Sequence, residues 1–141
     1  MVTEMDFIDG KGYTLEKIEK TDYINSTPYL LFSKRFVEKV GDVLCEDMQF
    51  FSCNLSCQGV GLDWYAARIM RRLPIIDKEK TTFSTLTDEV TKVVSIPKYR
   101  KDIEEPFGVA RDEEYIAYWV VSELFMNLCK NNGLQLLFNE V

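Results

Sequence analysis

The chain has 141 residues, of which 46% are hydrophobic, 28% charged and 13% aromatic, a composition typical of one globular domain that excludes an intrinsically disordered chain. Its 17 basic and 23 acidic residues give a formal net charge of -6, so nucleic acids and anionic membrane surfaces are repelled on average. We therefore expect neither a nucleic-acid partner nor a membrane partner. A basic protein partner fits this charge, although a mildly acidic balance also serves solubility alone.

The cellular compartment is suggested by the N-terminal sequence and the cysteines. The opening stretch, MVTEMDFIDGKG, carries acids where a secretory signal needs a basic start and an apolar run. No apolar stretch elsewhere approaches the roughly twenty residues that span a bilayer. We therefore expect the protein to stay in the cytoplasm, which keeps thiols reduced. The four cysteines are then expected to be free: Cys45, Cys53, Cys57 and Cys129.

Residues 1–141 are expected to form one domain, in which residues 1–27 have the least definite pattern. A short strand is expected at residues 5–8, and the polar segment 13–24 predicts no single element. The residue before Pro28 is pushed towards an extended conformation. The N-terminal fifth of the chain therefore contributes little to the predicted fold.

A strand followed by a capped helix is predicted from Tyr29 onward. Residues 29–32 are a short continuous apolar run, which suits a strand buried on both faces. Ser33 can act as a helix N-cap, and apolar residues at helical spacing through Leu44 predict an amphipathic helix. Gly41 weakens the last turn of that helix by about 1 kcal/mol relative to alanine.

The middle third of the chain is less regular. Residues 48–55 predict a strand that ends in a polar loop around Gly59 and Gly61, and residues 62–70 fit either a strand or a helix. Residues 75–81 then predict a strand end that leads into a charged turn, and residues 82–86 and 89–96 predict two strands. Residues 97–105 form a charged segment with at most one helical turn, and residues 106–111 form an apolar segment.

A second unit near the C-terminus repeats the first. Residues 116–121 predict a strand, Ser122 a helix cap, and the apolar spacing that follows predicts a helix. Gly133 can take the left-handed conformation that ends a helix, and residues 134–138 predict a closing strand. The two strand, cap, helix and strand units predict a single α+β domain with a mixed sheet on which the helices pack. Whether they arose by duplication or by convergent patterning stays open.

The sequence offers few of the groups on which catalysis depends. The chain has no histidine, which excludes Ser-His-Asp triads, Cys-His nucleophiles and His-ligated metals. It has no glycine-rich phosphate-binding motif, and the spacing of Cys45, Cys53 and Cys57 does not match structural zinc sites. We therefore expect no catalytic residues, no metal and no cofactor.

Acidic pairs and one aromatic and arginine cluster are the candidate binding residues. Adjacent acids are usually solvated loop residues, but they can also form a protein-binding surface. Trp64, beside Asp63 and close to Arg68, has the composition of an interface hot spot, although the tryptophan can instead fill the core. The predicted contact residues for a protein partner are Asp63, Trp64, Arg68, Glu104, Glu105, Asp112, Glu113 and Glu114.

Several motifs follow one another along residues 28–141. The first strand, serine and helix unit is followed by DKEKT at 77–81, by PFGVAR at 106–111, and by WVVS at 119–122 with its helix, a glycine and a final strand. This order resembles a family of bacterial polymorphic-toxin immunity proteins, immunity protein family eleven, first catalogued as a domain of unknown function. The chain has Thr81 where the family usually has serine.

The resemblance implies a small cytoplasmic protein that takes part in interbacterial competition. Such a protein is encoded beside a toxin, binds the toxin's effector domain and neutralises it by direct contact, without being an enzyme. Two alternatives stay open: a small hydrolase that uses Glu104, Glu105 or Asp112 with a cysteine thiolate, and a structural module of a larger assembly. The hydrolase needs acids that converge in a cleft, one with a raised pKa, whereas acids gathered on one face favour the inhibitor.

Overall fold

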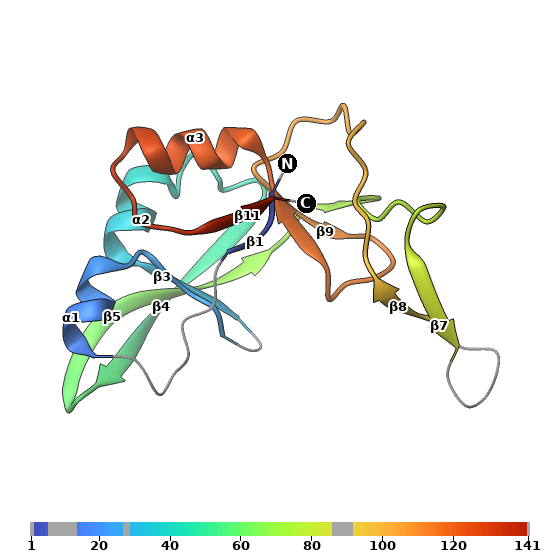
Figure 1. Ribbon diagram of the computed structural model, residues 1–141. Helices are drawn as coiled ribbons and strands as arrows, with labels where there is room; N and C mark the ends of the chain where they lie inside the picture. Colours follow the sequence, from blue (N-terminus) through green and yellow to red (C-terminus); the bar gives the residue numbers. More distant parts are fainter. Residues whose placement is uncertain (1, 6–13, 27–28, 86–91, 141) are drawn as a thin grey trace.

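The computed structural model describes residues 2–5, 14–26, 29–85 and 92–140, which form an α+β domain with three helices, two larger sheets and a separate hairpin (Figure 1). The fold class predicted from the sequence is thereby confirmed. The helices are α1 (Leu15–Lys20), α2 (Lys34–Val40) and α3 (Glu123–Asn131). The strands are β1 (Val2–Met5), β2 (Tyr23–Ile24), β3 (Leu30–Ser33), β4 (Met48–Cys57), β5 (Val60–Ile69), β6 (Arg72–Leu73), β7 (Thr82–Thr85), β8 (Lys92–Ile96), β9 (Val109–Asp112), β10 (Trp119–Val121) and β11 (Phe138–Glu140).

The two larger sheets differ in strand direction. The four-stranded sheet is antiparallel and has the order β2-β3-β5-β4. The five-stranded sheet has the order β11-β1-β10-β9-β6, and it is mixed because β6 runs parallel to β9. β7 and β8 form an antiparallel hairpin of their own, which extends away from the rest of the molecule (Figure 1).

The longest strands, β4 and β5, pair in continuous register as a hairpin. Its two turn residues, Gln58 and Gly59, have φ values of 51° and 76°, the positive values that a two-residue turn needs to match the twist of the strands. Gly61, which was expected in the loop, lies inside β5 because so tight a turn needs only two residues. For residues 62–70 the strand is correct and the helix is not.

The repeated sequence units bring two helices into one core. The Oγ atoms of Ser33 and Ser122 accept hydrogen bonds from the backbone N–H groups of Phe36 (3.0 Å) and Phe125 (3.4 Å), which confirms both predicted caps. α2 follows β3 of the four-stranded sheet, whereas α3 follows β10 of the five-stranded sheet. The helices pack against each other (Figure 1), and the fully buried rings of Phe36 and Phe125 have centroids 5.8 Å apart. The phenylalanine three places after each serine therefore joins the two sheets.

The end of α3 is also as predicted. Gly133 has a φ of 66°, in the left-handed region that favours glycine. The N–H of Leu134 donates to the carbonyl of Cys129 (2.9 Å), and the N–H of Gly133 donates to the carbonyl of Lys130 (3.2 Å). These two bonds form a Schellman motif, which satisfies carbonyl groups that the helix leaves free.

Three groups of buried apolar side chains hold the elements together. The largest, which includes Phe32, lies between the helices α2 and α3 and the two larger sheets. The second, which includes Ile75, packs with side chains from the segment that precedes β9. The third lies on the opposite face of the four-stranded sheet, where Ile18 of α1 packs in one group with Trp64 of β5. Both faces of this sheet are therefore partly covered.

The charged turn after residue 76 is confirmed and has a clear structural role. Asp77 Oδ1 accepts hydrogen bonds from the backbone N–H groups of Glu79 (3.1 Å) and Lys80 (3.2 Å). Thr81 Oγ1 accepts from the N–H of Lys98 (2.9 Å) and donates to its carbonyl (3.1 Å). The acid and the hydroxyl of this motif therefore fix the base of the hairpin formed by β7 and β8.

Two helices differ from their sequence expectations. Residues 15–20, for which no element was predicted, form α1 with Thr14 as its N-cap. This helix was not predicted because Ile18 is the one residue that it buries, and a single buried residue gives no apolar stripe in the sequence. α2 ends at Val40 and does not reach Leu44, because a series of turns begins at Gly41. None of the helices in the described part of the chain has the length and apolar character needed to cross a membrane.

The strand boundaries differ in several places. The closing strand β11 starts only at Phe138, because the backbone of Gln135 is bonded to Asp22 instead. The N–H of Gln135 donates to the carboxylate of Asp22 (2.6 Å), and the N–H of Asp22 donates to the carbonyl of Gln135 (3.0 Å). Residues 97–105 contain no helical turn and form one isolated bridge, between Ile76 and Tyr99. The expected N-terminal strand begins earlier, as β1. Parts of three predicted strands lie outside the described residues, at 6–8, 86 and 89–91.

We expect Phe125→Ala to lower the free energy of unfolding by about 3–5 kcal/mol, because it removes a fully buried ring from the contact between α2 and α3. The neighbouring Leu124→Ala removes a side chain that is half exposed on the same helix and should change stability by less than about 0.5 kcal/mol. Urea denaturation of both variants measures the difference. Similar losses in the two variants would contradict the packing of Phe125 between α2 and α3.

Candidate functional site

Asp47, in the turn between α2 and β4, carries a buried carboxylate. Its Oδ2 accepts hydrogen bonds from the backbone N–H groups of Gly108 and Val109, and its Oδ1 accepts one from Nε of Arg71. A carboxylate withdrawn from water destabilises a fold unless such donors surround it. The side chain of Asp47 therefore links the start of β4, in the four-stranded sheet, to the start of β9, in the five-stranded sheet.

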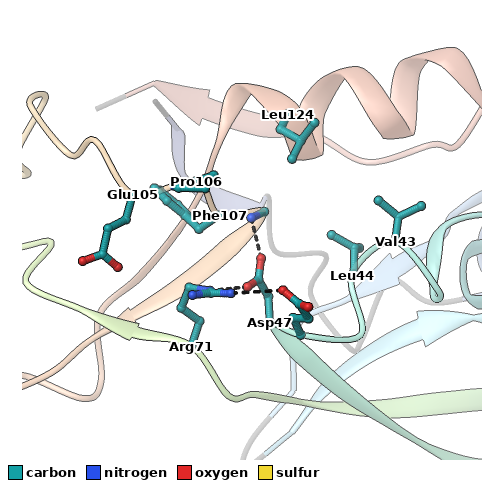
Figure 2. Close-up of a pocket in the computed structure, with 10 residues that line it drawn as sticks. Val43, Leu44, Asp47, Arg71, Glu105, Pro106, Phe107 and Leu124 are labelled. Carbon is teal, nitrogen blue, oxygen red and sulfur yellow. Dashed lines mark hydrogen bonds and ion pairs between the residues drawn. The ribbon is translucent and has the colours of Figure 1, made fainter.

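An open pocket of about 280 Å³ lies beside this carboxylate, and Figure 2 shows the side chains that line it. Val43, from the turn after α2, and Leu124, from α3, are 60% and 51% exposed. The other apolar side chains of the lining include Leu44 and Phe107, which are buried. Pro106 and Gly108 also line the pocket. Exposed aliphatic groups above a buried apolar wall are typical of a surface that receives another molecule.

Carboxylates determine the charge of this pocket. The hydrogen bond and the charge of Asp47, with smaller contributions from Glu46 and Glu105, raise the pKa of Arg71. Glu46 Oε2 lies 3.7 Å from the guanidinium of Arg71, and its side chain is 85% exposed. Two carboxylates therefore pair with the guanidinium of Arg71, Glu105 adds a smaller negative contribution, and the rim keeps a net negative charge. We term this site the acid-rimmed pocket, with Val43, Glu46, Glu105 and Leu124 at its opening and Asp47, Arg71 and Phe107 in its wall.

A second open pocket, of about 370 Å³, shares Glu105 with the first. It is also lined by Asp102 and Glu104, and by Arg100, whose Nε lies 3.0 Å from Oδ1 of Asp102. That hydrogen bond lowers the pKa of Asp102 and is the main cause of the raised pKa of Arg100, to which the charge of Glu113 adds a smaller contribution. The fold therefore gathers acids from distant parts of the sequence on adjoining pockets. We term them the acidic strip: Glu46, Asp102, Glu104 and Glu105.

Six of the eight predicted contact residues are exposed, but only some of them lie on or near the acidic strip. Glu104 and Glu105 belong to the acidic strip, and Glu113 lies within electrostatic reach of Arg100. Glu114 is exposed and forms an ion pair with Lys78. The structure does not bring Asp63 and Arg68 to this strip. Both are exposed on β5, and Arg68 lines a different pocket.

The remaining two predicted contact residues are buried, which corrects their assignment to a binding surface. Trp64 is 5% exposed and packs in the apolar group under α1. Asp112 is 2% exposed, and its carboxylate accepts hydrogen bonds from four backbone N–H groups at 2.7–3.0 Å. The donors belong to Ile75, Ile76, Glu114 and Tyr115. Neither side chain can reach a partner in this fold, because both serve internal contacts.

Several residues of the acid-rimmed pocket are not predicted by the sequence. Glu46 and Asp47 were visible only as one of several acidic pairs, and Arg71 only as part of an arginine doublet. Val43 fell on the predicted apolar stripe of α2, so its exposure was not foreseen. Leu124 was placed on the stripe of α3 for the same reason. No local signal separates these exposed apolar residues from their buried neighbours.

The four cysteines differ in their exposure. All four are free, as predicted. Cys129 is buried on α3, and burial together with the charge of Asp22 raises the pKa of its thiol to about 12. Cys45 is exposed, whereas Cys53 and Cys57 are half-buried on β4. Within the described ranges, no three Cys, Asp and Glu side chains are placed to hold a metal ion.

Comparisons of the chain with protein-family models, with curated proteins and with solved structures found no match. The resemblance to immunity protein family eleven therefore stays a prediction that rests on the sequence motifs.

We expect Asp47→Asn to lower the free energy of unfolding by at least about 2 kcal/mol, because the amide removes the charge opposite Arg71 and can turn a donor towards the N–H of Gly108. Glu46→Gln alters an exposed acid beside the same arginine and should cost less than about 0.5 kcal/mol. Urea unfolding followed by tryptophan fluorescence compares the two. Equal losses would mean that Asp47 does not tie the sheets together.

Cys129 should be unreactive in the folded protein, because its raised pKa keeps the thiol protonated and its position shields it. In a slightly alkaline buffer, a thiol-reactive disulfide reagent should modify Cys45 quickly and Cys129 only when the protein unfolds. Denaturant provides the control, since all four thiols then react. Rapid reaction of four thiols in the native protein would contradict this expectation.

Proposed function

We propose that this protein is an immunity protein, which binds the effector domain of a bacterial toxin and neutralises it by direct contact. The observation that carries the proposal is the acid-rimmed pocket, where exposed carboxylates stand beside exposed aliphatic side chains. The motif order along residues 28–141 supports it independently. In this proposal the protein works in the cytoplasm of the cell that it protects and has no enzymatic activity of its own.

The chemistry of the pocket fits a basic side chain of the toxin. A lysine or arginine carries a long apolar stem with a charge at its end. The stem can lie on Val43 and Leu124, while the charged end meets Glu46 and Glu105. Charges at an interface rim mainly raise the rate of association and exclude wrong partners. The acidic strip would therefore steer a basic toxin surface towards the pocket.

A hydrolase is less well supported by the same residues. It would need a carboxylate free to act on a substrate, whereas the oxygens of Asp112 already accept four backbone hydrogen bonds. It would also need a thiolate, whereas the pKa of Cys129 lies near 12. Glu104 and Glu105 are consecutive, exposed residues on open pockets, an environment that suits contact with a protein.

We expect Glu105→Lys and Glu46→Lys each to weaken binding to the toxin by at least about tenfold, because the rim charge then repels the basic partner. Leu124→Ala should weaken it by losing apolar contact while the fold stays intact. The binding partner in this measurement is the purified toxin-like product of the adjacent reading frame, and surface plasmon resonance gives the affinity. Survival of cells that express the toxin gives the protective effect.

Glu19→Lys is the matched control, because it makes the same charge change at an exposed position on α1. Its affinity should stay within about twofold of the unaltered protein, since charges beyond a Debye length of about 10 Å are screened. Full binding by Glu105→Lys would exclude the pocket as the contact site. Turnover of an ester or phosphodiester by the purified chain would argue for an enzyme, and a stable homo-oligomer that hides the strip would argue for a structural module.

A further inference from the structure

A pocket of about 260 Å³ lies on the other side of the arginine doublet, where the end of β5 comes close to β9 of the five-stranded sheet. Consecutive residues of an extended chain point to opposite sides. Arg71 accordingly belongs to the acid-rimmed pocket, while Arg72 lines this one. Arg68 from β5 and Arg111 from β9 line it as well. We term it the arginine pocket.

The positive charge of the arginine pocket is not balanced within the described part of the chain. The arginines of the described chain that form ion pairs lie outside this pocket: Arg35, Arg71 and Arg100. Arg72 and Arg111 are register partners across β6 and β9, an arrangement in which like charges repel. Burial and the charge of Arg72 lower the pKa of Arg111. The fold therefore holds three guanidinium groups together without an acid between them.

The remaining features of the pocket indicate which anion it suits. A guanidinium group presents paired N–H donors that match the oxygens of phosphate. The volume is at or below the lower end of ordinary ligand pockets, which favours a phosphate group with few further atoms. Tyr29 and Ile116, 48% and 53% exposed, add an aromatic and an aliphatic wall. The net charge of -6 opposes large polyanions, so a small anion fits better than a nucleic acid.

We propose that the arginine pocket binds a small phosphate-bearing anion, either inorganic phosphate or the phosphate group of a small aromatic ester. Arg68, Arg72 and Arg111 donate to the phosphate oxygens, and the anion offsets the repulsion between the two paired arginines. Tyr29 contacts the rest of the ester, where there is one. This site is separate from the proposed toxin contact, because the two pockets lie on opposite sides of the arginine doublet.

Thermal unfolding near neutral pH tests the proposal, with chloride replaced stepwise by phosphate at constant ionic strength. The melting temperature of the unaltered protein should rise with phosphate concentration, because the ligand binds only the folded state. Arg72→Gln and Arg68→Gln, both at exposed positions, should weaken the apparent affinity for phosphate by about tenfold to a hundredfold. In chloride alone, Arg72→Gln should melt at the same or a higher temperature than the unaltered protein, since it removes the repulsion with Arg111. An arginine with a purely structural role would give the opposite result.

Arg100→Gln is the matched control, because Arg100 is paired with Asp102 and lies outside the arginine pocket. It should keep the full response to phosphate. Calorimetry with inorganic phosphate and phenyl phosphate then identifies the source of the anion: equal affinities indicate the free ion, and tighter binding of phenyl phosphate indicates an ester. The proposal fails if phosphate stabilises no more than chloride does, if the Arg72 and Arg68 variants respond like the unaltered protein, or if Arg100→Gln loses the response equally. None of these results depends on toxin binding.

Discussion

The hydrogen bonds between the Asp47 carboxylate and the start of β9 hold the two larger sheets in one domain. They require a very close approach of the two chain segments. A Cβ atom added at Gly108 would lie 2.6 Å from Cδ2 of Leu44 and 3.2 Å from Oδ2 of Asp47, so glycine is the residue that lets the backbone come near enough. The main-chain carbonyl of Asp47 also accepts from the N–H of Met70 (2.7 Å). The same contacts form one wall of the acid-rimmed pocket.

Two further buried aspartates act in the same way. Asp22 accepts hydrogen bonds from Ser33 Oγ, from the guanidinium of Arg35 and from the backbone N–H of Gln135. Asp112 binds the backbone of Ile75 and its neighbours. Each carboxylate offsets its own loss of hydration by satisfying backbone donors that would otherwise be unpaired. Among the described residues, three buried aspartates therefore connect segments of the chain, while exposed acids such as Glu46 and Glu105 give the surface its charge.

The arginine doublet separates two surfaces of opposite charge. Arg71 neutralises a buried acid and leaves a negative rim, whereas Arg72 joins two other arginines with no acid among them. Because the alternation of an extended chain directs neighbouring side chains to opposite sides, one short stretch contributes to both sites. A molecule with this division can present acids to a basic protein partner and still hold a small anion. The overall charge of the chain describes only the first of these surfaces.

The sequence by itself determined the features that depend on residues a few places apart. Both serine caps, the phenylalanine three places after each, the glycine that ends α3 and the charged turn at Asp77 were predicted, because caps, turns and helical periodicity act within about one turn of chain. The absence of histidine likewise excluded several catalytic designs from composition alone.

Only the tertiary structure decided which acids are buried and which side chains meet. Asp112 and Glu113 are adjacent acids, yet one is enclosed by the backbone around Ile75 while the other is exposed. One hydrogen-bond partner of Asp22 lies 113 residues away and one of Asp47 lies 61 residues away, so no local pattern could reveal them. The cost of burying a charge depends on the donors that the whole fold brings to it, and those donors exist only once distant segments have been packed together.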